Sequence, residues 1–232
     1  MYNHKKILAF IGARKGSKGL KNKNILNLCG RPLICWTIQA ALGSKYIDRT
    51  LISTDGENIA RISKAAGADV PFLRPAKLAT DKAPIEGAIR HALDWIEKND
   101  KNSYDYLLLL QPTSPLRTSR HIDDAIKHYF RHRQTPGDTL VSVNRASPKT
   151  GWLMGKNSKG YIDFCFGLQD HRRQNIPSYY LPNGLIYLAP TKVIRRVGFY
   201  SSHTLPFVMD EKASVDIDSR EDFKHALKML SP

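Results

Sequence analysis

The sequence lacks any apolar run that approaches the ~20 residues of a membrane-spanning helix, so we expect no membrane partner. The apolar stretch at residues 7–11 leads into a basic loop instead of a small-residue cleavage site, which argues against a signal peptide. Cysteine is scarce as well: the chain has only Cys29, Cys35 and Cys165, and no CxxC pair. This odd number indicates free thiols in a reducing compartment, so we expect a cytoplasmic protein.

Acidic residues are in short supply, with 21 Asp and Glu against 36 Lys and Arg and a formal net charge of +15. Such an excess favours an anionic partner, which could be nucleic acid, an acidic membrane surface or a small polyanion such as a nucleotide. Residues 1–24 contain seven Lys or Arg and no acid, whereas residues 210–222 are rich in acids. A basic nucleic-acid face has little use for that acidic cluster, but a site that holds phosphates through divalent cations does. We therefore expect a nucleotide and not nucleic acid.

The pattern of apolar residues predicts one α/β domain over residues 1–232. We predict strands at residues 6–13, 49–53, 69–73, 104–110, 139–143 and 184–189. We predict helices at residues 32–42, 57–66, 86–97, 120–131 and 219–230, the last with a capping box made by Ser219 and Asp222. This alternation favours a mostly parallel sheet with helices on both faces. Residues 145–182 are richer in Gly, Pro, aromatic and basic residues and interrupt the alternation, which predicts a small inserted arm.

A basic, glycine-containing loop at residues 12–24 follows the first predicted strand, at the edge where open α/β sheets bind ligands. Its glycine spacing does not fit a dinucleotide fingerprint. It is not a Walker A loop either, because Ser17 and Gly19 occupy the wrong positions. Glycines still let backbone N–H groups approach phosphate oxygens, and Arg and Lys neutralise phosphate charge. The loop therefore predicts phosphate binding, with a solvated basic loop as the alternative.

Further polar residues follow predicted strands, and each has a structural alternative. Asp55 could be catalytic or could cap the helix that begins near residue 57. Gln111 ends a buried strand and precedes a loop fixed by prolines, so it either faces the ligand crevice or belongs to a rigid turn. The adjacent Arg172 and Arg173 suit a carboxylate or phosphate, or form a surface basic pair.

Two aspartates in the acidic cluster, Asp216 and Asp218, flank Ile217. On an extended chain they project to the same side and repel unless a cation lies between them. Mg²⁺ is bound by one or two carboxylates together with substrate phosphate oxygens, and Mn²⁺ is also possible here. The alternative, Asp218 as a helix cap beside Ser219, leaves Asp216 unexplained.

The order and content of these motifs resemble those of the CMP-sialic acid synthetases, also called acylneuraminate cytidylyltransferases, from about residue 7 to residue 230. In chain order the motifs are Ala13 to Gly19 with Lys23-Asn24, Ser53-Thr54-Asp55, Arg74-Pro75, Leu78 to Asp81, Gln111 to Arg117, Arg173-Gln174, Pro182-Asn183-Gly184 and Asp216-Ile217-Asp218.

This resemblance implies a Rossmann-like nucleotidyltransferase that transfers CMP from CTP to the anomeric hydroxyl of a nonulosonic acid, such as N-acetylneuraminic or legionaminic acid, and releases pyrophosphate. It implies catalytic roles for Arg14, Lys18 and Asp218, and Mg²⁺ on Asp216 and Asp218. The implied nucleotide-binding residues are Ala13, Arg14, Ser17, Lys23, Asn24 and Arg74, and the implied sugar-binding residues are Gln111, Lys149, Arg173, Asn183 and Tyr187. It also implies a homodimer whose arm reaches the neighbouring site, so that Arg173 or Lys149 acts in trans.

The sequence departs from the family pattern at Lys15, Lys21 and Ile85, and the last puts one serine contact with the nucleotide in doubt. A sister enzyme of the CMP-Kdo synthetase type and a basic nucleic-acid-binding protein remain the alternatives. The basic loop at Lys18 and the Arg172-Arg173 pair favour the sialate branch. The variable arm is expected to select the particular sugar.

Overall fold

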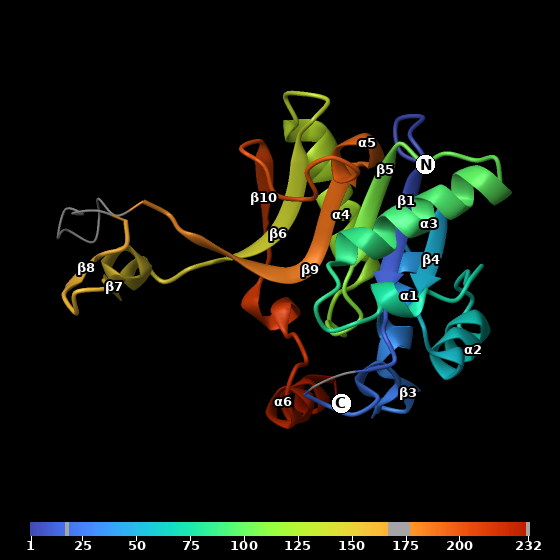
Figure 1. The fold of residues 1–232 in the computed structure, drawn as a ribbon, viewed down its shortest axis with the longest axis horizontal. Coiled ribbons are helices and arrows are strands. Elements are labelled where there is room, and N and C mark those ends of the chain that lie inside the picture. Colours follow the sequence, from blue (N-terminus) through green and yellow to red (C-terminus); the bar gives the residue numbers. More distant parts are fainter. Residues whose placement is uncertain (17–18, 167–176, 231–232) are drawn as a thin grey trace.

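The structure is a computed structural model that describes residues 1–16, 19–166 and 177–230. Its centre is a six-stranded sheet in the order β10-β6-β9-β5-β1-β4 (Figure 1). The strands are β1 (Ile7–Gly12), β4 (Arg49–Ser53), β5 (Tyr106–Leu110), β6 (Thr139–Arg145), β9 (Tyr180–Pro190) and β10 (Thr204–Val208). Only β9 runs antiparallel to its neighbours in this sheet, so the predicted mostly parallel sheet is confirmed.

Helices cover both faces of the sheet. They are α1 (Leu33–Leu42), α2 (Glu57–Ala65), α3 (Ile85–Asn99), α4 (Ser119–His132), α5 (Thr191–Ile194) and α6 (Arg220–Leu230). Along β1, Ile7 and Ile11 join the core that includes residues of α1 and α4, whereas Phe10 joins the core beneath α3. Successive side chains of a strand point to opposite faces, so a strand buried on both faces must be apolar throughout. Figure 1 shows α3 crossing one face, with α4 behind the sheet.

Residues 69–73 differ from the prediction because they form no regular strand. Asp69 and Leu73 make isolated parallel bridges to Leu51 and Thr54, and Pro71 lies between them. Proline has no N–H to donate, so a continuous ladder cannot pass through it. The other predicted helices and strands are present, with ends shifted by a few residues.

The shorter elements lie around the sheet. They are η1 (Lys23–Ile25), β2 (Asn27–Leu28), β3 (Arg31–Pro32), η2 (Ala76–Leu78), η3 (Pro148–Trp152), β7 (Met154–Lys156), β8 (Ile162–Phe164) and η5 (Glu211–Ser214). Between β6 and β9 the chain leaves the sheet, and the hairpin of β7 and β8 projects from the body (Figure 1). Large apolar side chains are exposed along this projection and at the start of β9, namely Leu153, Met154, Tyr161, Ile162, Phe166, Tyr180 and Leu181. Among the described helices, none combines the length and the apolar character needed to cross a membrane.

Candidate active site

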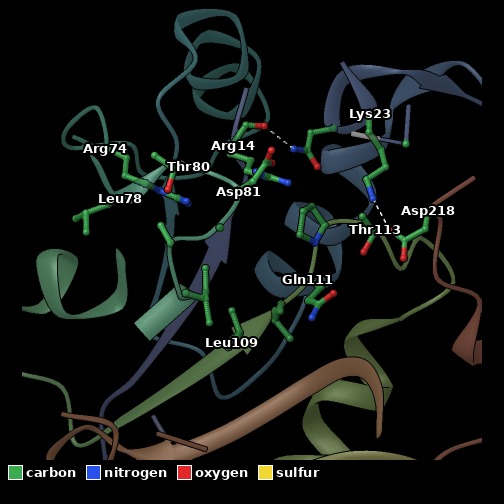
Figure 2. Close-up of a pocket in the computed structure, with 17 residues that line it drawn as sticks. Arg14, Lys23, Arg74, Leu78, Thr80, Asp81, Leu109, Gln111, Thr113 and Asp218 are labelled. Atoms are coloured by element: carbon green, nitrogen blue, oxygen red, sulfur yellow. Dashed lines mark hydrogen bonds and ion pairs between the residues drawn. The ribbon is translucent and has the colours of Figure 1, made fainter. Parts of the chain in front are cut away.

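The loop after β1, the end of β5 and the segment before α6 meet at one cavity of about 420 Å³. β1 and β5 are parallel neighbours, so the loops that leave their C-terminal ends lie side by side. Figure 2 shows Arg74 and Thr80 on one side of this cavity and Lys23 and Asp218 on the other. The polar lining consists of Arg14, Lys23, Asn24, Arg74, Thr80, Asp81, Gln111, Thr113 and Asp218.

An ion pair joins the basic loop to the acidic segment: Lys23 Nζ lies 2.7 Å from Asp218 Oδ1. Lys23 is largely buried, whereas the side chain of Asp218, which lines the cavity, is 76% exposed. The alternative role of Asp218 as a helix cap is not observed. Instead, the Ser219 hydroxyl accepts a hydrogen bond from the Asp222 N–H, and the Asp222 carboxylate accepts one from the Ser219 N–H. The predicted capping box is thus present, and the Asp218 carboxylate remains available to the cavity.

Asp216 is the less exposed member of the aspartate pair. Between the two, Ile217 is fully buried and donates its N–H to the Thr113 carbonyl at 2.9 Å. Burial raises the pKa of the Asp216 carboxyl, a hydrogen bond from Thr113 opposes that rise, and the nearby charge of Asp218 adds to it. The buried Asp216 Oδ1 atom has no hydrogen-bond partner among the described residues.

The donor set fits a hard cation that is only partly held by protein. The described residues contain no cluster of three or more His, Cys, Asp or Glu side chains that could hold a metal ion. Mg²⁺, however, usually keeps several waters and takes one or two carboxylates plus phosphate oxygens. The unpartnered oxygen of Asp216 and the neighbouring Asp218 carboxylate suit that kind of binding.

The basic loop is held in place by polar contacts. The Asp55 carboxylate accepts a hydrogen bond from the Lys15 N–H at 2.7 Å, and Asn24 Nδ2 donates to the Arg14 carbonyl at 3.0 Å. Asp55 therefore orders the loop; it does not cap α2, which begins after Gly56 without a side-chain cap. The Arg14 guanidinium forms an ion pair with Asp81, and the two side chains lie together at the cavity (Figure 2).

Arg74 lies on the side of the first cavity opposite Lys23 and Asp218 (Figure 2). It is 6% exposed, and its Nε donates to Ser53 Oγ at 3.0 Å. Burial lowers the pKa of Arg74 to about 10, so the side chain stays cationic at neutral pH. At the end of β1, a Cβ on Gly12 would lie 2.7 Å from Ile85 Cδ1 and 3.2 Å from Arg74 Nη2, so a larger residue there would force these side chains to shift.

A second cavity of about 520 Å³ lies beside the first, on the β6 and β9 side. The side chain of Gln111 lies at the boundary, because Gln111 lines both cavities. The polar lining of this second cavity includes Gln111, Asn144, Arg145, Asn183, Tyr187, Glu211, Ser214 and Asp216. Three predicted sugar-binding residues, Gln111, Asn183 and Tyr187, therefore gather in one place.

The amide of Asn183 is already fully used inside the protein. Its Oδ1 accepts from the Ser142 hydroxyl at 2.6 Å, and its Nδ2 donates to Asn144 Oδ1 at 2.7 Å and to Ser214 Oγ at 3.1 Å. Asn183 thus shapes the wall of the second cavity by holding two other residues that line it, Asn144 and Ser214. Tyr187 is buried against Phe199, and this burial raises the pKa of its hydroxyl.

Not every predicted residue reaches these cavities. Lys149 is exposed on η3 and lines neither of them. Ser17, Lys18 and Arg173 lie outside the described residues. Conversely, the structure adds residues that were not predicted to bind a ligand, namely Asp81, Thr113, Asn144, Arg145, Glu211 and Ser214. The position of Asn144 and Arg145 at the end of a predicted strand was the signal that could have identified them.

Comparison of folds gives the class of the protein. A solved structure described as CMP:2-keto-3-deoxy-manno-octonic acid synthetase complexed with CTP matches with a TM-score of 0.71 at 15% identity, and the match covers 97% of this chain and 98% of that one. The chain therefore shares the fold of that synthetase.

Sequence comparison gives the family. A family model described as cytidylyltransferase matches residues 8–158. The N-acylneuraminate cytidylyltransferase of Escherichia coli is 38% identical over 224 residues, or 96% of this chain and 51% of that protein. The CMP-N,N'-diacetyllegionaminic acid synthase of Legionella pneumophila is 36% identical over 230 residues, or 97% of this chain and 96% of that protein. The chain belongs to the cytidylyltransferase family, as its motifs predicted, and spans about half the length of the Escherichia coli relative.

Proposed function

We propose that this protein transfers CMP from CTP to the anomeric hydroxyl of a nonulosonic acid and releases pyrophosphate. The observation that carries the proposal is the placement of Gln111 and the Asp216–Asp218 pair between a cation-lined cavity and a second polar cavity. The first cavity suits a nucleoside triphosphate and the second a hydroxylated sugar acid. The names of the relatives support this pairing of substrates.

In the first cavity, Arg14 and Lys23 neutralise the triphosphate, and Asn24 and Arg74 contact the cytidine. Both phosphate-binding cations already hold carboxylates, Asp81 and Asp218. Binding of the nucleotide therefore exchanges two ion pairs with carboxylates for charge-assisted contacts with phosphate oxygens. Lys18, as predicted from the sequence, adds to the neutralisation of the leaving pyrophosphate.

Asp216 and Asp218 hold Mg²⁺ in this proposal, and Mn²⁺ fits the same oxygen donors. When bound, such a cation neutralises phosphate charge and acts as a Lewis acid toward the oxygens it contacts. The chain itself supplies positioning and charge, which dominate catalysis of phosphoryl and nucleotidyl transfer. Gln111 aligns the sugar between the cavities, so that its anomeric hydroxyl attacks the α-phosphorus while pyrophosphate departs.

A pyrophosphate-release assay tests the function. CTP is offered with N-acetylneuraminic, legionaminic and pseudaminic acids and with Kdo, each with Mg²⁺ and with a chelator. The proposal predicts equal amounts of pyrophosphate and a CMP-sugar with one of the nine-carbon acids, and only with the cation present. Turnover with Kdo alone would instead identify the sister enzyme, and turnover with none of the sugars would overturn the proposal.

The projection between β6 and β9 supports a homodimer. On it, Tyr161 and Ile162 are 71% and 66% exposed, and at the start of β9 Leu181 is 58% exposed. A second copy would cover these apolar surfaces and bring Lys149 and Arg173 to the neighbouring sugar cavity. Light scattering during size exclusion tests this: the wild type should elute as a dimer, and Ile162→Glu with Leu181→Glu as a monomer. A monomeric wild type would exclude action in trans. The free cysteines suit the cytoplasm as the compartment of this reaction.

A further inference from the structure

Arg117 is a buried arginine beside the proposed site that contacts neither cavity. It is 2% exposed and lines neither of them. Its guanidinium donates to the Leu185 carbonyl at 2.8 Å, to the Thr37 hydroxyl at 2.6 Å and to the Gln111 carbonyl at 2.8 Å. All of these acceptors are neutral oxygens.

Packing alone does not explain a charge at this position. Burial lowers the pKa of Arg117 to about 9, and the charge of Asp216 opposes that fall without bonding to it. A buried charge bound only to neutral partners costs free energy that an apolar side chain of similar volume would avoid. What the guanidinium alone provides is a rigid fork that holds two main-chain carbonyls at once.

Those two carbonyls belong to neighbouring segments that enclose the Gln111 side chain. Leu110 of β5 pairs with Ile186 of β9, so Gln111 and Leu185 lie at adjacent strand positions. Next to Leu185, Gly184 has a φ of 78°, and a Cβ placed there would lie 3.4 Å from Gln111 Oε1. The Gln111 amide therefore lies beside Gly184. Holding both carbonyls fixes the backbone of Gln111 relative to this part of β9.

We infer that Arg117 is a positioning residue that sets the orientation of Gln111 toward the sugar acid. The inference rests on the proposed function, since it assigns Gln111 to the sugar. Thr37 of α1 completes the arrangement, because its hydroxyl accepts from Arg117 and donates to the Gln111 carbonyl at 3.3 Å. Arg117 and Thr37 act through Gln111 and touch no substrate.

Thr37 offers the cleaner test, because changes at Arg117 risk unfolding the protein. Thr37→Val keeps the shape and removes the hydroxyl, whereas Thr37→Ser keeps the hydroxyl. Thr50→Val is the matched control: Thr50 is also buried, but its hydroxyl has no hydrogen-bond partner among the described residues. Arg117→Lys, Gln111→Ala and the double variant Thr37→Val with Gln111→Ala complete the set.

Steady-state kinetics with the sugar acid that the wild type uses, together with CTP binding by calorimetry, give the readouts. We expect Thr37→Val to lower kcat/KM for the sugar about tenfold, since small misplacements of a positioning group are costly. The dissociation constant of CTP should change less than about twofold, and Thr37→Ser and Thr50→Val should resemble the wild type. The double variant should be no worse than Gln111→Ala alone, because both changes remove one function.

Additive losses in the double variant would overturn the inference, because Thr37 would then act independently of Gln111. A parallel loss of CTP affinity, or an equal loss in Thr50→Val, would also overturn it by showing a general structural effect. Arg117→Lys should follow Thr37→Val if its melting temperature stays near that of the wild type. A wild type without turnover on any sugar acid would overturn the proposed function, and with it this inference.

Discussion

Gly19 and Asp218 approach so closely that no side chain fits between them: a Cβ on Gly19 would lie 2.3 Å from the Asp218 carbonyl oxygen. The two residues are far apart in the sequence, yet both line the first cavity, where Figure 2 shows Asp218. The glycine is required here for close approach of two backbones. The basic loop and the acidic segment are therefore one structural unit.

Gly19→Ala should push the basic loop and the acidic segment apart. The methyl group meets a carbonyl oxygen that belongs to the main chain, so the loop or the segment before α6 must shift. A shift of about 1 Å in a positioning element can cost about 10²-fold, and we expect CMP-sugar formation to fall by at least about tenfold. Gly137→Ala, outside the basic loop, is the control, since a Cβ there would meet only Thr135 Oγ1, at 3.8 Å. Equal activity of the two variants would show that the close approach is irrelevant to catalysis.

Asp81→Asn should strengthen CTP binding. Arg14 is paired with Asp81 before the nucleotide arrives, and both side chains are partly exposed. An exposed ion pair contributes at most about 1 kcal/mol. Because CTP must displace this pair, its removal should lower the dissociation constant of CTP by up to about fivefold. Calorimetry at low salt measures this, and the gain should shrink at high salt. Weaker CTP binding would mean that Asp81 helps to hold the nucleotide.

Asp218→Ala should remove most turnover, by about 10²-fold or more if this carboxylate holds the catalytic cation. Because the change also frees Lys23, CTP binding without a divalent cation should stay the same or improve. Comparing binding with and without Mg²⁺ separates the two effects. Asp124→Ala on the exposed face of α4 serves as a control. Near-normal CMP-sugar formation by Asp218→Ala would refute the assignment.

Stability should fall on mild acidification because of His128 on α4. Burial and the neighbouring His132 lower the pKa of His128 below its ordinary value of 6.5. The unfolded chain then takes up a proton at a higher pH than the folded chain, so stability is lost as the pH falls through about 6.5. The melting temperature should fall between about pH 7.5 and about pH 5.5, and it should fall less for His128→Gln than for the wild type. His225→Gln, at an exposed position, should melt like the wild type, and an unchanged difference in His128→Gln would contradict the account.

Local signals predicted much of the fold. Strands β1 and β5 are buried on both faces, so their continuous apolar sequence identified them directly. The capping box at Ser219 and Asp222 is a pattern of local spacing and was found correctly. The strand predicted at residues 69–73 was wrong because the apolar pattern outweighed the effect of Pro71.

The site was predicted only in part, because its electrostatics depend on contacts between distant segments. Spacing indicated that Asp216 and Asp218 act together, but it could not show that Lys23 holds one of them. The hydrogen bonds that occupy the Asn183 amide, and those from Arg117 to two main-chain carbonyls, likewise depend on tertiary contacts. Neither residue type nor spacing specifies such partners.

The most direct test follows the phosphorus of CTP. The protein is incubated with Mg²⁺, its sugar acid and CTP labelled with ³²P at either the α or the γ position. If the basic loop and the aspartate pair hold one nucleotide for attack at its α-phosphorus, the α label will appear in a sugar nucleotide and the γ label in pyrophosphate. Transfer of the γ label to the sugar, or no transfer of either label, would contradict this account.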